Sequence, residues 1–231
     1  MSTAARVPST PLLVAAGIAF VLVLAVLVSS DLTDAFDRSI IDAVRSDLAR
    51  DVLSPLRLIT ELGSTVAVTA MAAVAIVVSV AIGPWRHGVA GAFTILLASL
   101  LNSLLKITIA RDRPELLEPI IVERGFSFPS GHSALGMVAY GVLAVLISRS
   151  RLPARVRVAI VVALGVLVGL IGISRIWLGV HYPTDVLAGW TAGGVIVLIY
   201  AALTRRVSPE PAAGAVDADP GAQRSDPPAA G

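Results

Sequence analysis

The sequence predicts an all-α protein, a bundle of six transmembrane helices. Of its 231 residues, 56% are hydrophobic and only 15% are charged, whereas soluble domains carry about 25% charged residues. Backbone polar groups need internal partners in lipid, so uncharged runs near the ~20 residues that cross a bilayer favour helices. Six runs lack any charged residue, namely Pro11–Val28, Thr65–Ile82, Gly88–Leu105, Ser133–Ser148, Val158–Ile173 and Val186–Leu203.

The first run, Pro11–Val28, follows a short segment, residues 1–10, that we expect to be a cytoplasmic N-terminus. The alternative interpretation of this run is a cleaved signal peptide. The run is longer than a usual signal-peptide core, and no clear A-x-A cleavage site follows it. We therefore interpret it as the first transmembrane helix.

Residues 30–64 separate the first two predicted helices and carry four arginines and seven acids. In the stretch AFDRSIIDAVRSDLARDVLSPLRLI, apolar residues recur at helical spacing, which is typical of amphipathic helices. One interpretation is one or two short helices that lie on the extracytoplasmic membrane surface. The alternative is an ordinary folded loop.

Arginines in short loops orient the predicted bundle, because cytoplasmic loops carry an excess of basic residues. Residues 149–157 carry four arginines, Arg86 lies between the second and third helices, and two arginines at 205–206 follow the sixth. With six spans, all of these residues lie on one side together with Arg6. We therefore expect a multi-pass protein of the cell inner (plasma) membrane with both termini in the cytoplasm.

The six predicted helices form one membrane domain, residues 11–206. The remaining residues, 207–231, are rich in Pro, Ala, Gly and Asp. Such a composition cannot bury enough apolar surface to form a core. We therefore expect a disordered cytoplasmic tail.

Polar residues gather on the opposite, extracytoplasmic side of the predicted bundle. Three loops there supply Lys106, Arg111, Arg113, Ser130, His132, Arg175, His181 and Asp185. A lone cation at a helix end often only extends to the membrane interface. Cations that converge from separate loops favour an anionic ligand, and the planar fork of arginine matches phosphate oxygens.

The stretch FPSGHSALG predicts a helix start beside these cations. Ser130 is a candidate N-cap, and the fourth transmembrane helix should begin near Gly131. Free N–H groups and a partial positive charge at a helix N-terminus bind anions. His132, in the first turn, would point toward the same anion. The alternative is a simple turn with an interfacial histidine.

His181 and Asp185 are four residues apart in SRIWLGVHYPTD, a spacing that shares one helix face. Pro183 is expected near the first turn of the sixth helix. A carboxylate that accepts Nδ1–H from His181 would leave Nε2 with a free lone pair, as in catalytic triads. No serine or cysteine is placed to be activated, so the imidazole itself is the candidate nucleophile and His132 the candidate acid. A purely structural His–Asp hydrogen bond is the alternative.

Composition disfavours several other functions. The net charge of +2 gives no reason to expect a nucleic-acid partner. The chain has no cysteine, which excludes disulfides, thiol nucleophiles and cysteine metal sites. The polar loops also lack the paired carboxylates or histidine clusters that hold zinc or calcium.

Three motifs resemble those of the type 2 phosphatidic acid phosphatase superfamily, the lipid phosphatase group related to the vanadium haloperoxidases. KITIARDRP fits K-x6-R-P through Lys106, Arg113 and Pro114. PSGH spans residues 129–132, and SRIWLGVHYPTD fits S-R-x5-H-x3-D over residues 174–185. The motifs occur in order across about a third of the chain, and none of the defining positions departs from the pattern.

The resemblance implies a role for each of these positions. His181 would attack phosphorus, Asp185 would orient it, and His132 would protonate the leaving oxygen and then activate water. The phosphoryl oxygens would be bound by Lys106, Arg113, Ser130, Gly131 and Arg175. Members of this family work without a metal ion, so the resemblance implies no cofactor.

We therefore expect an integral membrane lipid phosphatase with its active site at the extracytoplasmic membrane interface and a metal-independent phosphohistidine mechanism. Candidate substrates are phosphatidic acid, phosphatidylglycerol phosphate and a polyprenyl diphosphate such as undecaprenyl diphosphate. The alternative is an anionic-lipid transporter or flippase without hydrolysis. A transporter needs polar residues near the bilayer midplane, where the predicted helices hold little beyond scattered Ser and Thr.

Overall fold

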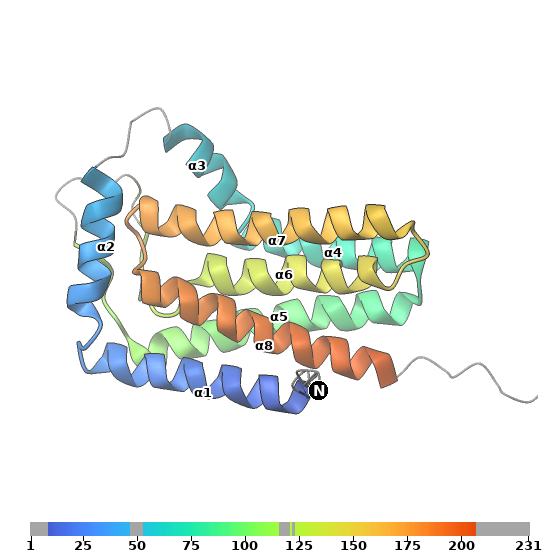
Figure 1. Cartoon of the computed structure of the whole chain (residues 1–231), viewed down its shortest axis with the longest axis horizontal. Coiled ribbons are helices and arrows are strands. Elements are labelled where there is room, and N and C mark those ends of the chain that lie inside the picture. The colour runs from blue at the N-terminus through green and yellow to red at the C-terminus, as the bar shows by residue number, and fades with distance from the viewer. Residues whose placement is uncertain (1–8, 47–52, 116–120, 122, 207–231) are drawn as a thin grey trace, which may run out of the picture.

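The computed structural model describes residues 9–46, 53–115, 121 and 123–206, which contain eight helices and no strand (Figure 1). The helices are α1 (Thr10–Ser29), α2 (Asp34–Ser46), α3 (Leu53–Glu61), α4 (Thr65–Ile82), α5 (Trp85–Ile109), α6 (Gly131–Ser148), α7 (Ala154–Trp177) and α8 (Pro183–Arg206). Among the described residues, α1 and α4–α8 are long and apolar enough to cross a membrane. Each contains one of the six predicted runs, so the all-α transmembrane bundle is confirmed.

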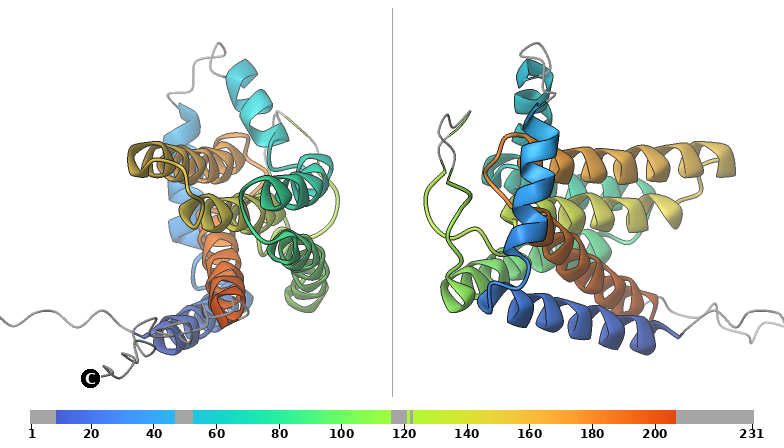
Figure 2. Two further views of the ribbon diagram at one scale, coloured as in Figure 1. Left: turned by 90° about the vertical axis from the view of Figure 1, so that its right-hand side faces the viewer. Right: turned by 60° about the vertical axis from the view of Figure 1, so that its left-hand side comes forward.

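Helix α6 forms the centre of the bundle and packs against α4, α5, α7 and α8 (Figure 2). More than half of α6 is buried, whereas the other five spans are at most one-third buried. Val138 and Val142 of α6 are fully buried and join Ile95 of α5 and Tyr200 of α8 in the main hydrophobic cluster. The outer helices expose large apolar side chains, as expected where lipid covers a helix.

Glycines in α8 allow α6 and α8 to approach closely. A Cβ atom at Gly193 would lie 2.6 Å from the carbonyl oxygen of Ala134 and 2.8 Å from Cβ of Met137. At Gly189, a Cβ atom would lie 2.7 Å from the carbonyl oxygen of Ser130. Small residues at helix crossings let backbones approach in membranes. This contact fixes the N-terminus of α6 beside the first turns of α8.

Helices α2 and α3 lie at one end of the bundle, and α2 crosses that end (Figures 1 and 2). α2 packs against α7 and α8, and α3 packs against α7. Residues 30–64 thus contain two short helices, with residues 47–52 outside the described residues. Their position on a membrane surface stays a prediction. The predictions for residues 1–8 and 207–231 also fall outside the described residues.

The same end of the bundle gathers the C-terminal ends of α1, α5 and α7 and the N-terminal ends of α4, α6 and α8 (Figure 1). The described residues between α5 and α6, which are 110–115, 121 and 123–130, and the turn that links α7 to α8 also lie there. Residues that are far apart in the sequence therefore meet beneath α2 and α3.

We expect Gly193→Ala to destabilise the protein, because the added methyl group would collide with the backbone of α6. Gly194→Ala is the matched control, since no described atom outside its own helix lies within 4 Å of its Cβ position. Alanine is intrinsically better than glycine in a helix by about 1 kcal/mol, whereas overpacking costs about 1–3 kcal/mol. Thermal unfolding in detergent should show a lower midpoint for Gly193→Ala alone. Equal midpoints for both variants would contradict the close α6–α8 contact.

Candidate active site

The structure brings all eight predicted site residues to the end of the bundle that α2 crosses. Lys106 lies in the last turn of α5, and Arg113 lies in the segment that follows it. The start of α6 carries Ser130, Gly131 and His132. Arg175 lies in the last turn of α7, His181 in the loop between α7 and α8, and Asp185 in the first turn of α8. Five of them, Lys106, Arg113, Gly131, His132 and His181, line one cavity of about 380 Å³. Arg175 and His132 line an adjoining cavity.

Two arginines anchor the cationic side of this site. Arg175 is only 1% exposed, donates from NH1 to Oγ1 of Thr60 on α3 (2.6 Å) and pairs through NH2 with the carboxylate of Glu123. Its Nε is buried without a partner among the described residues. Arg113 donates from NH1 to the carbonyl oxygen of Val180 at 2.8 Å and from Nε to that of Gly125 at 2.9 Å. These bonds fix both guanidinium groups beside the cavity.

The amino group of Lys106 donates to the carbonyl oxygen of Phe126 at 2.5 Å. Helix α6 begins beside it at Gly131, where a Cβ atom would lie 3.9 Å from Cε of Lys106 and 3.3 Å from the side-chain nitrogen of Asn102. Ser130 is the N-cap by position, but its side chain makes no capping hydrogen bond within the described structure. Its hydroxyl oxygen instead accepts a hydrogen bond from Ser133. The first N–H groups of α6 therefore have no side-chain cap beside the cavity.

Glu123 occupies the middle of the cationic cluster. Oε2 lies 3.1 Å from NH1 of Arg113 and 4.0 Å from Nε2 of His181, and Oε1 pairs with Arg175. Burial alone would raise the pKa of this carboxyl, but the charges of Arg175, His181, His132 and Arg113 lower it to about 2. Glu123 is therefore ionised at neutral pH, and its carboxylate lies where these cations would bind another anion.

The environment of His181 fixes its tautomer and its charge. Nδ1 faces Oδ2 of Asp185 at 3.4 Å, and Nε2 lies 3.3 Å from NH1 of Arg113. A carboxylate accepts and a guanidinium donates, so both contacts are satisfied by a proton on Nδ1 and a lone pair on Nε2. Burial lowers the pKa of His181 well below its usual value, and Arg175, Lys106 and Arg113 lower it further. The imidazole is therefore neutral at pH 7, with Nε2 facing the cavity that it lines.

The predicted contact between His181 and Asp185 is present, but the expected reason for it was wrong. His181 does not share a helix face with Asp185, because α8 begins only at Pro183. The contact forms because the carboxylate folds back over its own helix start, where Oδ2 accepts from the backbone N–H of Tyr182 at 2.9 Å. Pro183 is therefore the first residue of α8, and the helix begins between His181 and Asp185.

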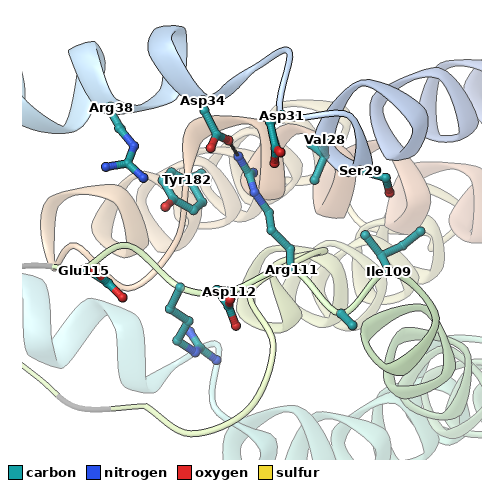
Figure 3. A pocket seen from close by; sticks show the side chains of 12 residues that line it. Val28, Ser29, Asp31, Asp34, Arg38, Ile109, Arg111, Asp112, Glu115 and Tyr182 are labelled. Carbon is teal, nitrogen blue, oxygen red and sulfur yellow. Dashed lines mark hydrogen bonds and ion pairs between the residues drawn. The ribbon is translucent and has the colours of Figure 1, made fainter.

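Arg111 lies beside the site rather than in its cavity. Figure 3 shows its side chain extending from the segment after α5 toward Asp34 on α2, beside the ring of Tyr182. The guanidinium carbon lies 3.9 Å from the centre of that ring. The sequence groups Arg111 with the cations on this side of the bundle but not with the predicted phosphate-binding residues, and in the structure it pairs with carboxylates.

Some residues at the site were missed by sequence reasoning. Glu123 follows a stretch of sequence with no helical or strand periodicity, and Thr60 is an ordinary threonine within α3. Neither residue therefore belonged to a motif that indicated a role at the site. Asp37 on α2 has the sequence context of an ordinary surface acid, yet it is fully buried.

Among the described residues, no group of three His, Asp or Glu side chains is arranged to hold a metal ion. Metal independence itself stays a prediction.

Comparison with known proteins identifies relatives of the chain. It is 43% identical over 96 residues to phosphatidylglycerophosphatase B of Bacillus subtilis, a match that covers 41% of this chain and 46% of that protein. It is 34% identical over 122 residues to lipid A 1-phosphatase of Rhizobium etli, with 49% and 48% of the two chains covered. The chain thus spans about half the length of these two relatives.

Structural similarity extends over most of the chain. The fold superposes on the crystal structure of a transmembrane PAP2-type phosphatidylglycerolphosphate phosphatase from Bacillus subtilis with a TM-score of 0.78, 27% identity and coverage of 84% of this chain and 97% of the other. A family model described as the PAP2 superfamily matches residues 88–208, which is more than half of the chain and includes every predicted site residue. The chain therefore belongs to the PAP2 superfamily.

Proposed function

We propose that this protein is a membrane phosphatase that hydrolyses the phosphate ester or diphosphate of a lipid through a phosphohistidine intermediate. One observation carries the proposal: a neutral imidazole, His181, presents Nε2 to a cavity lined by Lys106 and Arg113, next to Arg175. A neutral nucleophile among fixed cations matches the needs of phosphoryl transfer, which depends mainly on positioning and charge stabilisation.

The phosphoryl group would replace the carboxylate of Glu123 against the two arginines. Its equatorial oxygens would be bound by Arg113 and Arg175, including the Nε of Arg175 that has no partner among the described residues. Lys106 and the uncapped N–H groups at the start of α6, from Gly131 onward, would complete the cradle. Ser130 would contribute through its hydroxyl proton, because its hydroxyl oxygen accepts from Ser133 and its backbone N–H donates to the carbonyl oxygen of Asp185 at 3.0 Å.

The reaction would proceed as two displacements. In the first, NH1 of Arg113 would exchange its contact with Nε2 of His181 for a phosphoryl oxygen, which frees the lone pair. Nε2 then attacks phosphorus, the bond from phosphorus to the lipid oxygen breaks, and a protonated His132 donates its proton to that oxygen. Asp185 stabilises the positive charge that develops on the imidazole. In the second, His132 removes a proton from water, the resulting hydroxide attacks phosphorus, and the phosphorus–nitrogen bond breaks to regenerate His181.

The position of the cavity supports a lipid substrate. Its walls include Thr65 at the start of α4 and Ser99, Asn102 and Ser103 of α5, all within transmembrane helices. A phosphate on a lipid could thus meet the cations while its acyl or prenyl chains stay beside α4 and α5. Two relatives are named for phosphatidylglycerophosphate and lipid A, which supports an amphiphilic phosphate as substrate, with phosphatidylglycerol phosphate the first to test.

The orientation of the site also belongs to this proposal. The arginine-rich segment 149–157 and Arg205 lie at the end of the bundle opposite to the cavity (Figure 1). Because basic loops favour the cytoplasm, this arrangement supports cytoplasmic termini and a site that opens toward the outer face of the membrane.

We expect His181→Ala to lower phosphate release from phosphatidylglycerol phosphate by about 10³-fold or more, because the variant lacks the nucleophile. His87→Gln is the matched control, since His87 lies in the first turn of α5 at the opposite end of the bundle. The assay measures released phosphate in detergent micelles with a chelator present, and with phosphatidic acid and undecaprenyl diphosphate in parallel. Undiminished release by His181→Ala would refute the nucleophile, and loss of release on chelation would refute metal independence.

We expect Glu123→Gln to raise the affinity for inorganic phosphate by about tenfold, or about 1.4 kcal/mol. The carboxylate competes for Arg113 and Arg175, and its pKa of about 2 keeps it charged at every pH of a normal assay. Glu115→Gln, a change at an exposed acid that does not line this cavity, is the control. Product inhibition by phosphate measures the effect. Weaker inhibition of Glu123→Gln would show that Glu123 holds the arginines in place rather than competing with the ligand.

A further inference from the structure

A buried polar network joins α2 to the start of α8. Arg111 donates from NH2 to Oδ2 of Asp37 at 2.9 Å and to Oδ1 of Asp34 at 3.1 Å, both on α2. From NH1 it donates to Oδ1 of Asp185 and to Oγ1 of Thr184, each at 2.9 Å. One guanidinium group therefore bridges α2 and α8, although Asp37 and Thr184 are 147 residues apart in the sequence.

Asp37 binds the start of α8 directly as well as through Arg111. Its Oδ1 accepts from the backbone N–H of Thr184 at 3.0 Å, and its Oδ2 accepts from the hydroxyl group of the same residue at 2.6 Å. The first N–H groups of a helix have no partner within the helix. Asp37 supplies that partner from another element, and it is fully buried there. A buried carboxylate with three donors restricts how α8 can move relative to α2.

The orientation of Asp185 depends on the same network. Oδ2 is held by the backbone N–H of Tyr182 and faces Nδ1 of His181, while Oδ1 is held by Arg111. With each oxygen bound to a fixed donor, the carboxylate cannot rotate away from the imidazole. The chain of contacts runs from Asp37 through Arg111 and Asp185 to His181, although Asp37 and Arg111 do not line the cavity.

We propose that Asp37 and Arg111 are positioning residues, which act through Asp185 to hold the imidazole of His181 in line with the phosphoryl group. This inference rests on the proposed function, because it concerns the efficiency of the same nucleophile. It also gives α2 a role in catalysis that its amphipathic sequence did not reveal. Burial alone would lower the pKa of Arg111, but the carboxylates of Asp185 and Asp37 raise it, so the bridge stays charged.

The chain offers a matched pair of variants for the test, Asp37→Asn and Asp34→Asn. Both acids lie in the first turn of α2 and both bind NH2 of Arg111. Only Asp37 also binds Thr184, and it is fully buried, whereas the side chain of Asp34 is 34% exposed. The two substitutions are chemically identical, and the sites differ in the contact to α8 and in burial.

The experiment measures kcat and KM with phosphatidylglycerol phosphate, together with the number of sites that bind orthovanadate, an analogue of the phosphoryl group. We expect Asp37→Asn to lower kcat per vanadate-binding site by about 10²-fold, as is typical when a reacting group is displaced by about 1 Å. KM and the number of sites should stay near their wild-type values. Asp34→Asn should reduce kcat by no more than about fivefold, because Asp34 is partly exposed and binds only NH2 of Arg111, which Asp37 also holds.

A merely structural role would give a different result. If Asp37→Asn lost vanadate sites and activity in proportion, with an unchanged kcat per site, the proposal would be overturned. Arg111→Lys keeps the charge but cannot bridge two carboxylates, and it provides the same test should Asp37→Asn not fold. An unchanged kcat per site in that variant would overturn the proposal equally. A wild-type protein that binds vanadate but releases no phosphate would instead contradict the proposed function.

Discussion

The pairing of buried positive charge at the rim of a transmembrane bundle is the constraint on which the rest of this structure depends. A buried charge without partners costs several kcal/mol, which is comparable to the whole stability of a domain. Arg175 is paired through NH1 with Thr60 of α3 and through NH2 with Glu123, and Arg111 is paired with carboxylates on α2 and α8. The two short helices at this end of the bundle supply acceptors for these cations, carboxylates from α2 and the hydroxyl oxygen of Thr60 from α3.

The same pairing makes the site suitable for phosphate chemistry. The guanidinium groups of Arg113 and Arg175 are fixed by carbonyl, hydroxyl and carboxylate oxygens before any ligand arrives. Exchange of the Glu123 carboxylate for a phosphoryl group would keep the charge of the cavity balanced with little reorganisation. Preorganised donors in a site shielded from water are the largest single source of stabilisation in many enzymes.

Much of this arrangement could be predicted from the sequence, and the remainder has a physical reason for escaping it. Uncharged runs predicted all six long helices, and their alternating direction placed Lys106 and His181 at the same end. Asp37 escaped because an acid that caps another helix has the same local sequence as a surface acid. Glu123 escaped because its position depends on tertiary contacts to Arg175 rather than on any periodic pattern. The contact between His181 and Asp185 was predicted from their spacing within one helix. In the fold, α8 begins between the two residues, and Asp185 reaches His181 from the first turn of that helix.

The proposed mechanism requires His181 to carry the phosphoryl group during turnover. The most direct measurement is peptide mapping of protein that has been mixed rapidly with a phosphorus-radiolabelled lipid phosphate and quenched in base, where phosphohistidine survives. We expect a transient, acid-labile label on the peptide that contains His181. Label on His132 instead, or product formation with no covalent label at any quench time, would contradict it.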